Sequence, residues 1–277
     1  MRPPFAKRAS LGDGMAIRRT VAGDDDPAGA QKDALERRMI GALVQFWREQ
    51  AGRIRRAIEP VVPSDRKAAG LTDIWKMLDR AFWTAEEREL LAVLLPAMLE
   101  GAAGGVDAHA AEIEALGLGV DWTLPHTEAA AWARKYSAEL IKGITGTTKD
   151  KIRQLVGGWI ETPGSTLGDL YSTFQSDYGF SERRARLIAI TETTRAYAGG
   201  EIAAAAAIEA EGLFTYAKRW QTNNDELVCQ ICEPLNQKTA DGARGMFDSS
   251  VGQIDGPPAH PGCRCWVSFV PVIEGAT

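Results

Sequence analysis

The sequence is poor in histidine and cysteine, with three and four of these residues among 277. Neither His109 nor His126 lies beside a cysteine or a paired carboxylate, so no serine–histidine–aspartate or cysteine–histidine nucleophile is evident. The segment Gly143–Gly146 lacks the later Gly-Lys-Ser/Thr of a phosphate-binding loop. The sequence therefore gives no support for nucleophilic catalysis or for nucleotide binding.

Long apolar runs and an excess of positive charge are also missing. No uninterrupted run reaches the roughly 18 apolar residues that a membrane-spanning helix needs, and the longest candidate, Leu90–Leu99, is too short. The first 20 residues carry basic side chains but no continuous apolar segment of a signal peptide. The net charge of -5 argues against general attraction to DNA or to anionic lipid. We therefore expect no membrane partner, and any DNA contact would need a local basic patch.

Composition and pattern predict a mainly α protein with three parts. An apolar content of 45% and a charged content of 25% are typical of globular proteins. Residues 1–29 are rich in Gly, Pro, Ala and charge, which predicts a flexible N-terminal arm. Residues 30–212 show helical periods and predict a helical body. Residues 213–277 bring aromatic and β-branched residues with Gly and Pro turns, and predict a small β-rich module containing a Cys/His cluster.

Several helix boundaries can be predicted within the body. A long amphipathic helix is expected over residues 31–59, ended by Pro60, and a shorter one over 71–83. Thr84 and Glu87 form a capping-box pattern that would open a helix up to residue 100. Further expected features are a break at Gly101, Gly104 and Gly105, a helix over 127–141 after Pro125, a helix over 149–160 capped by Thr147 or Thr148, a helix over 167–177 capped by Thr166, and a helix through residue 208 capped by Ser181.

The strongest chemical signal is a Cys/His cluster near the C-terminus. Cys229-x-x-Cys232 is followed by His260-Pro-Gly-Cys263-Arg-Cys265. Two such turns, joined by an excursion of hairpin size, are how small zinc modules assemble a tetrahedral site. At most four of the five residues can bind one structural zinc ion, so an all-cysteine set and a set of three cysteines with His260 both stay open. Reduced thiols and a disulfide pair are the competing interpretations.

An arginine-rich helix precedes this cluster. Arg183-Arg184-Ala-Arg186 is followed by Thr191-Glu-Thr-Thr-Arg195, in which Glu192 lies one turn before Arg195 and can pair with it. These arginines could contact phosphate, but with no net basic charge we favour a solvated face. The cluster of Arg53, Arg55 and Arg56 receives the same interpretation.

These motifs, taken in order, resemble the phage Mu F-like family of minor head, or head morphogenesis, proteins of tailed bacteriophages. The resemblance covers about residues 140–272 and does not extend to residues 1–130. It is carried by Ser181-Glu-Arg-Arg-Ala-Arg-Leu-Ile-Ala-Ile-Thr-Glu-Thr-Thr-Arg195, Arg219-Trp-Gln-Thr222, Cys229-x-x-Cys232 and Pro257-Pro-Ala-His-Pro-Gly-Cys-Arg-Cys265.

The resemblance implies a structural component of the virion and not an enzyme. It implies a protein made in the host cytoplasm during assembly and located in the head interior or at the portal vertex. The implied partners are the portal protein, the major capsid protein or both, with packaged DNA as a further contact. Two alternatives come from the residues themselves: a zinc-dependent nuclease or hydrolase using His260 with Asp225 or Glu226, and a DNA-binding module.

Overall fold

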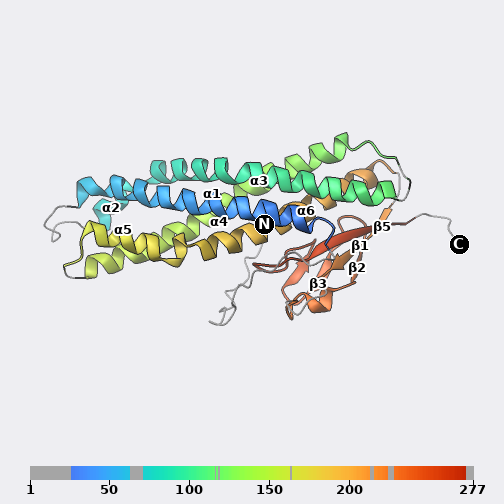
Figure 1. Cartoon of the computed structure of the whole chain (residues 1–277). Coiled ribbons are helices and arrows are strands. Elements are labelled where there is room, and N and C mark those ends of the chain that lie inside the picture. The colour runs from blue at the N-terminus through green and yellow to red at the C-terminus, as the bar shows by residue number, and fades with distance from the viewer. Residues whose placement is uncertain are drawn as a thin grey trace.

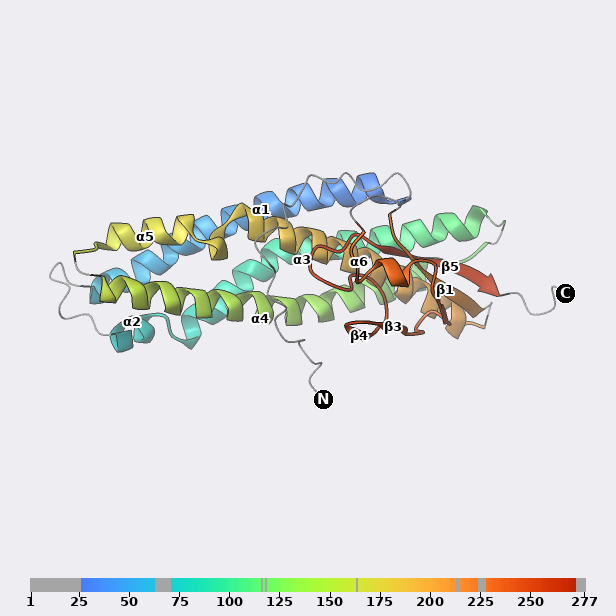
Figure 2. The same cartoon turned by 90° about the horizontal axis from the view of Figure 1, so that it is seen from below.

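The computed structural model describes residues 26–62, 71–115, 117, 119–162, 164–212, 215–223 and 228–272. Most of the predicted N-terminal arm, residues 1–25, lies outside these residues. The helices run lengthwise beside one another in an elongated bundle, and the strands form a small module beside one end of it (Figure 1). The view from below shows the same two parts (Figure 2). The prediction of a mainly α fold with a small C-terminal β-rich module is confirmed.

The helical part consists of two short and four long α-helices among the described residues. The long helices pack side by side, and α6 contacts α1, α3 and α4. Their bounds, in chain order, are α1 Gly29–Ile58, α2 Leu71–Met77, α3 Arg80–Ala115, α4 Thr123–Glu161, α5 Leu167–Ser176 and α6 Glu182–Ala210.

Three of the predicted helices are confirmed with their ends. In α1 the periodic apolar residues Leu35, Leu43 and Ile54 are buried, and the helix ends at Ile58 before Pro60. Helix α5 begins with a capping box in which Thr166 and Asp169 bond reciprocally, and the Ser181 hydroxyl caps α6. These ends are predictable because a capping side chain replaces backbone bonds that the first turn cannot make.

The predicted break at Gly101, Gly104 and Gly105 is wrong, because α3 runs through all three glycines. A Cβ atom on Gly105 would lie 2.1 Å from the Tyr197 carbonyl oxygen, and one on Gly200 would lie 2.0 Å from the Ala102 carbonyl oxygen. The glycines therefore let the α3 and α6 backbones approach closely. The predicted capping role of Thr84 is also wrong, because that residue lies inside α3.

Helix α4 is likewise longer than predicted. It begins at Thr123 and continues to Glu161, where the sequence indicated two helices with Pro125 outside the first. Pro125 lies in the first turn, whose N–H groups have no intrahelical acceptor, so its missing donor costs little. The hydroxyls of Thr147 and Thr148 donate to the carbonyls of Gly143 and Ile144, and neither residue caps a helix.

Helix α3 is long and apolar enough to cross a membrane by length and composition alone. Its longest uninterrupted apolar run, Leu90–Leu99, is too short to mark it in the sequence. In the fold, this helix packs against α1, α4 and α6, and buries Leu90, Leu94 and Met98. The most apolar 18-residue window of this helix is 39% buried.

The β-rich module contains two small antiparallel sheets. Three strands lie in the order β2-β1-β5, with Trp220 opposite Val267, and two further strands pair as β3 with β4. The bounds are β1 Thr215–Gln221, β2 Thr239–Asp241, β3 Phe247–Ser249, β4 Gly252–Ile254 and β5 Trp266–Val272. Its apolar core is completed by Ile113 of α3 and by Ile202 and Ile208 of α6. The module therefore shares its core with the bundle.

Polar contacts within and beside the module complete this packing. One oxygen of Glu209, near the end of α6, accepts from the Tyr216 N–H, and the other accepts from the Ala243 N–H. Lys218 on β1 is fully buried, and its Nζ donates to the carbonyls of Ala243 and Asp255. Burial lowers the pKa of Lys218 to about 8. The sequence did not single out either residue.

The contact between α3 and α6 predicts opposite effects for two glycine substitutions. Gly200→Ala should lower the free energy of unfolding by about 1–3 kcal/mol, because the new methyl group must push two backbones apart. Gly143→Ala should raise it by up to about 1 kcal/mol, because nothing lies within 4 Å of that position and alanine favours the helix. Denaturant unfolding would measure both, and equal effects would contradict the close approach.

Candidate metal centre and motif interface

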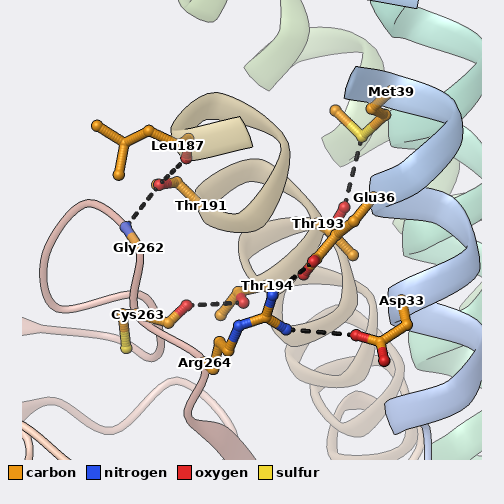
Figure 3. A network of polar contacts seen from close by, with 10 residues as sticks. All are labelled: Asp33, Glu36, Met39, Leu187, Thr191, Thr193, Thr194, Gly262, Cys263 and Arg264. Carbon is orange, nitrogen blue, oxygen red and sulfur yellow. Dashed lines mark hydrogen bonds and ion pairs between the residues drawn. The ribbon is translucent and has the colours of Figure 1, made fainter. Parts of the chain in front are cut away.

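Two motifs that are far apart in the sequence meet where α6 contacts the module (Figure 3). The Thr191 hydroxyl accepts a hydrogen bond of 2.9 Å from the Gly262 N–H and donates to the Leu187 carbonyl. One turn later, the Thr194 hydroxyl donates to the Cys263 carbonyl at 2.9 Å. The two threonines thus hold the backbone of the loop that carries His260, Cys263 and Cys265.

The side chain of Arg264 extends from the same loop to α1 (Figure 3). It donates to Glu36 at 2.8 Å and lies 3.4 Å from Asp33, with all three side chains largely buried. Burial raises the pKa of Glu36, and Arg264 opposes this shift. Thr193 of α6 also contacts α1, through the Met39 sulfur at 3.4 Å. The interface therefore joins the module, α6 and α1.

The remaining motif carboxylate, Glu192, faces α4. Its side chain accepts a hydrogen bond of 2.8 Å from the Tyr136 hydroxyl and lies 3.9 Å from the Arg195 Nε, which confirms the expected pairing of Glu192 with Arg195. Burial raises the pKa of Glu192, opposed by Arg195 and Tyr136. Residues 191–194 therefore reach three different parts of the protein.

The interpretation of all these arginines as a solvated face is wrong for two of them. Arg184 is buried, lies over the Trp47 ring, and donates to the Gly179 carbonyl at 2.6 Å. Arg53 pairs with the buried carboxylate of Glu86 at 2.6 Å. Sequence alone could not separate these two from the exposed arginines beside them, because their partners lie on other helices.

The structure brings the five candidate metal ligands together as two groups that share Cys232. One group joins Cys229, Cys232 and His260, and the other joins Cys232, Cys263 and Cys265, with the ligand atoms of each group within 4.8 Å of one another. The Cys229 Sγ lies 3.0 Å from the His260 Nε2, and the Cys232 Sγ lies 3.7 Å from the Cys263 Sγ. All four cysteines are free thiols, and all but Cys229 are buried.

Local contacts orient the His260 ring and shift the pKa values of Cys232 and Cys263. The His260 Nδ1 lies 2.9 Å from the Pro261 carbonyl, which can only accept a hydrogen bond. That contact places the imidazole proton on Nδ1 and leaves the Nε2 lone pair facing the cysteines, as in histidines that bind metals. A hydrogen bond to Cys263 raises the pKa of the Cys232 thiol, and the same contact lowers the pKa of Cys263.

Comparison with known proteins agrees with these motifs. Residues 150–268 match the family described as Phage Mu protein F like protein. This segment is similar to the phage Mu F-like family. No curated protein and no solved structure gave a match. The resemblance expected from the motifs is confirmed, and it supports a role in phage head morphogenesis at the level of the family.

The phage Mu F-like segment contains α5, α6, four complete strands and all five Cys/His residues, but not α1. The acidic partners of Arg264 therefore come from outside the matched segment, because Asp33 and Glu36 belong to α1. The sequence gave no signal for these two acidic residues, which lie more than 220 residues from Arg264.

The Arg264 contact predicts a clear loss of stability. Arg264→Met should lower the free energy of unfolding by about 1–3 kcal/mol, because it leaves the largely buried Glu36 carboxylate without its partner, while solvent screens part of the contact. Adding Glu36→Gln should recover part of this loss. The exposed pair of Arg186 with Glu182 supplies the control, and Arg186→Met should change stability by at most about 0.5 kcal/mol. Equal losses in the two single variants would contradict the proposed importance of the contact.

Proposed function

We propose that the protein is a minor head protein of a tailed bacteriophage, a structural component located in the head interior or at the portal vertex. The proposal is supported by the contacts that the motif residues make within the chain. Thr191, Thr194 and Arg264 all bind other parts of the same chain. Residues committed to holding two parts of a protein together support a structural role better than a catalytic one.

The proposed partners are the portal protein, the major capsid protein or both. The helices run lengthwise in an elongated bundle (Figure 1), and such proteins could dock on the exposed side chains along them. Packaged DNA is a further proposed contact, and it would use exposed arginines such as Arg56 and Arg183. Arg53 and Arg184 are excluded from that contact by their internal partners.

A zinc-dependent nuclease or hydrolase remains the alternative from another functional class. A catalytic zinc site keeps one open position and usually has a nearby carboxylate base. Within the described residues, neither Cys/His group includes a carboxylate. Asp225 and Glu226, the carboxylates considered from the sequence, lie outside those residues. Metal-dependent DNA cleavage that disappears in His260→Ala would favour this alternative.

The location can be tested on purified particles. Mass spectrometry of virions and procapsids should detect the chain in both, at far lower copy number than the major capsid protein. Lysate from the same infected cells is the control, because it shows that the protein was made. Presence in the lysate together with absence from both kinds of particle would refute the proposed function.

We also propose that the Cys/His cluster holds one structural zinc ion. Two sulfurs bound to one tetrahedral zinc at about 2.3 Å lie roughly 3.8 Å apart, and the Cys232 and Cys263 sulfurs are separated by 3.7 Å. The Cys229 to His260 contact of 3.0 Å would have to open by about half an ångström to reach the same geometry. Cys229, Cys232 and Cys263 are the proposed common ligands, with His260 or Cys265 as the fourth.

Metal removal should loosen the module and spare the bundle. Chelator treatment or Cys229→Ser should increase proteolysis after residue 214, while the helical circular dichroism signal stays largely unchanged, because the ion would cross-link two segments about thirty residues apart. Comparing His260→Ala with Cys265→Ser should identify the fourth ligand, since only its loss lowers the zinc content. Freshly purified, reduced protein without zinc, together with unchanged proteolysis after chelation, would reject the metal.

A further inference from the structure

A cleft of about 410 Å³ lies where α4, α6 and the module meet. Its lining does not include Thr191, Thr194 or Arg264, which form the interface described above. Its walls come from α4, from the part of α6 between Arg195 and Ala203, and from two loops of the module. Two residues of the family motifs that the interface does not use, Arg195 and Pro257, line this cleft. Their position suggests that this part of the motifs serves binding.

One of the cations that line the cleft, Arg195, has an incomplete set of hydrogen-bond acceptors. The Arg195 guanidinium lies 5.4 Å from the centre of the Tyr136 ring. Its Nε is buried and donates no hydrogen bond within the described part of the chain, since the Glu192 oxygen at 3.9 Å is too far away. The Arg195 side chain as a whole is 32% exposed, so a ligand carboxylate in the cleft would pair with the accessible part of this cation.

The rim of the cleft carries both signs of charge. Lys135 of α4 and Arg244 of the module are exposed, and neither forms an ion pair with another described residue. Glu128 and Asp255 line the same cleft and are also exposed. A ligand that fits this rim therefore carries a negative charge that faces Lys135 and Arg244. A positive charge on the same ligand could face Glu128 and Asp255.

The walls are partly apolar and fixed by packing. The Trp132 ring stacks on Tyr136 with centroids 5.4 Å apart and planes 5° apart. The same ring lies so close to Gly199 that a Cβ atom there would be 2.3 Å from it. Pro257 is buried beside them. A cleft already formed by rigid groups binds a ligand with less loss of conformational entropy.

We propose that this cleft receives an acidic peptide segment of a partner head protein, with an Asp or Glu side chain bound by Arg195. The proposal rests on the proposed function, because it assigns the cleft as the surface that binds one of the proposed partners. Alternating charges around apolar walls match the anatomy of protein interfaces. A nucleic-acid strand fits less well, because its successive phosphates would face Glu128 and Asp255 on a protein with a net charge of -5.

The test uses the full chain during assembly and two neighbouring positions on α4. A photo-crosslinking residue, p-benzoylphenylalanine, replaces Lys135, which lines the cleft, or Arg134, which is exposed but does not. We expect position 135 to crosslink, in procapsids, to one peptide of another head protein that contains Asp or Glu. Position 134 should give at most a tenth of that yield. Adding Arg244→Glu should reduce the yield from position 135 about tenfold, as repulsion of about 1.4 kcal/mol would.

Each other outcome overturns the inference. Crosslinking to DNA would assign the cleft to nucleic acid. Equal yields from both positions, a yield unchanged by Arg244→Glu, or a crosslinked peptide without an acidic residue would remove the charge argument. Particles that contain the chain but give no product at position 135 would reject the cleft while leaving the proposed function intact. Absence of the unmodified chain from particles would instead reject the proposed function.

Discussion

Helix α6 packs against α1, α3 and α4 and also contacts β1 and β5 of the module. Gly200 of α6 and Gly105 of α3 allow backbone contact between these helices. Thr191 and Thr194 on α6 form hydrogen bonds with the backbone of the loop that carries the candidate metal ligands His260, Cys263 and Cys265. A single helix thus presents small residues to the bundle and hydroxyls to the module. Any shift of α6 along its axis would break both sets of contacts together, since hydrogen bonds weaken steeply with distance and angle.

Local signals predicted those features that are determined locally. The caps at Thr166 and Ser181 were predictable because a hydroxyl and the first turn lie within three residues of each other. The glycines at 101–105 were misinterpreted because their role depends on α6, some 95 residues later, and a helix interior tolerates glycine when packing compensates for its entropy cost. Thr147 and Thr148 failed as caps for a similar reason, since α4 gains more from continuing across the bundle than from ending there.

The candidate site divides in the same way. Spacing alone selected Cys229, Cys232 and the His260 loop, because metal-binding turns have short sequence signatures, and the structure brings these residues together. Asp33, Glu36 and Tyr136 could not be selected, because each meets its motif partner only through tertiary packing. The buried amine of Lys218 was missed for the opposite reason: one polar residue in a strand normally points to solvent, and here two carbonyls face it instead.

The shared core also bears on how the two parts of the chain hold together. The β2-β1-β5 sheet has three strands, and β2 is only three residues long. So small a sheet buries little apolar surface by itself and normally needs further packing to be stable. Here Ile113, Ile202 and Ile208 of the bundle complete that core, while Glu209 and Arg264 fix the module from two sides. The predicted boundary near residue 212 therefore separates two kinds of secondary structure but not two independent cores. The bundle supplies the packing that the module lacks, and a metal cross-link would add local stiffness to the loop that α6 and α1 already hold.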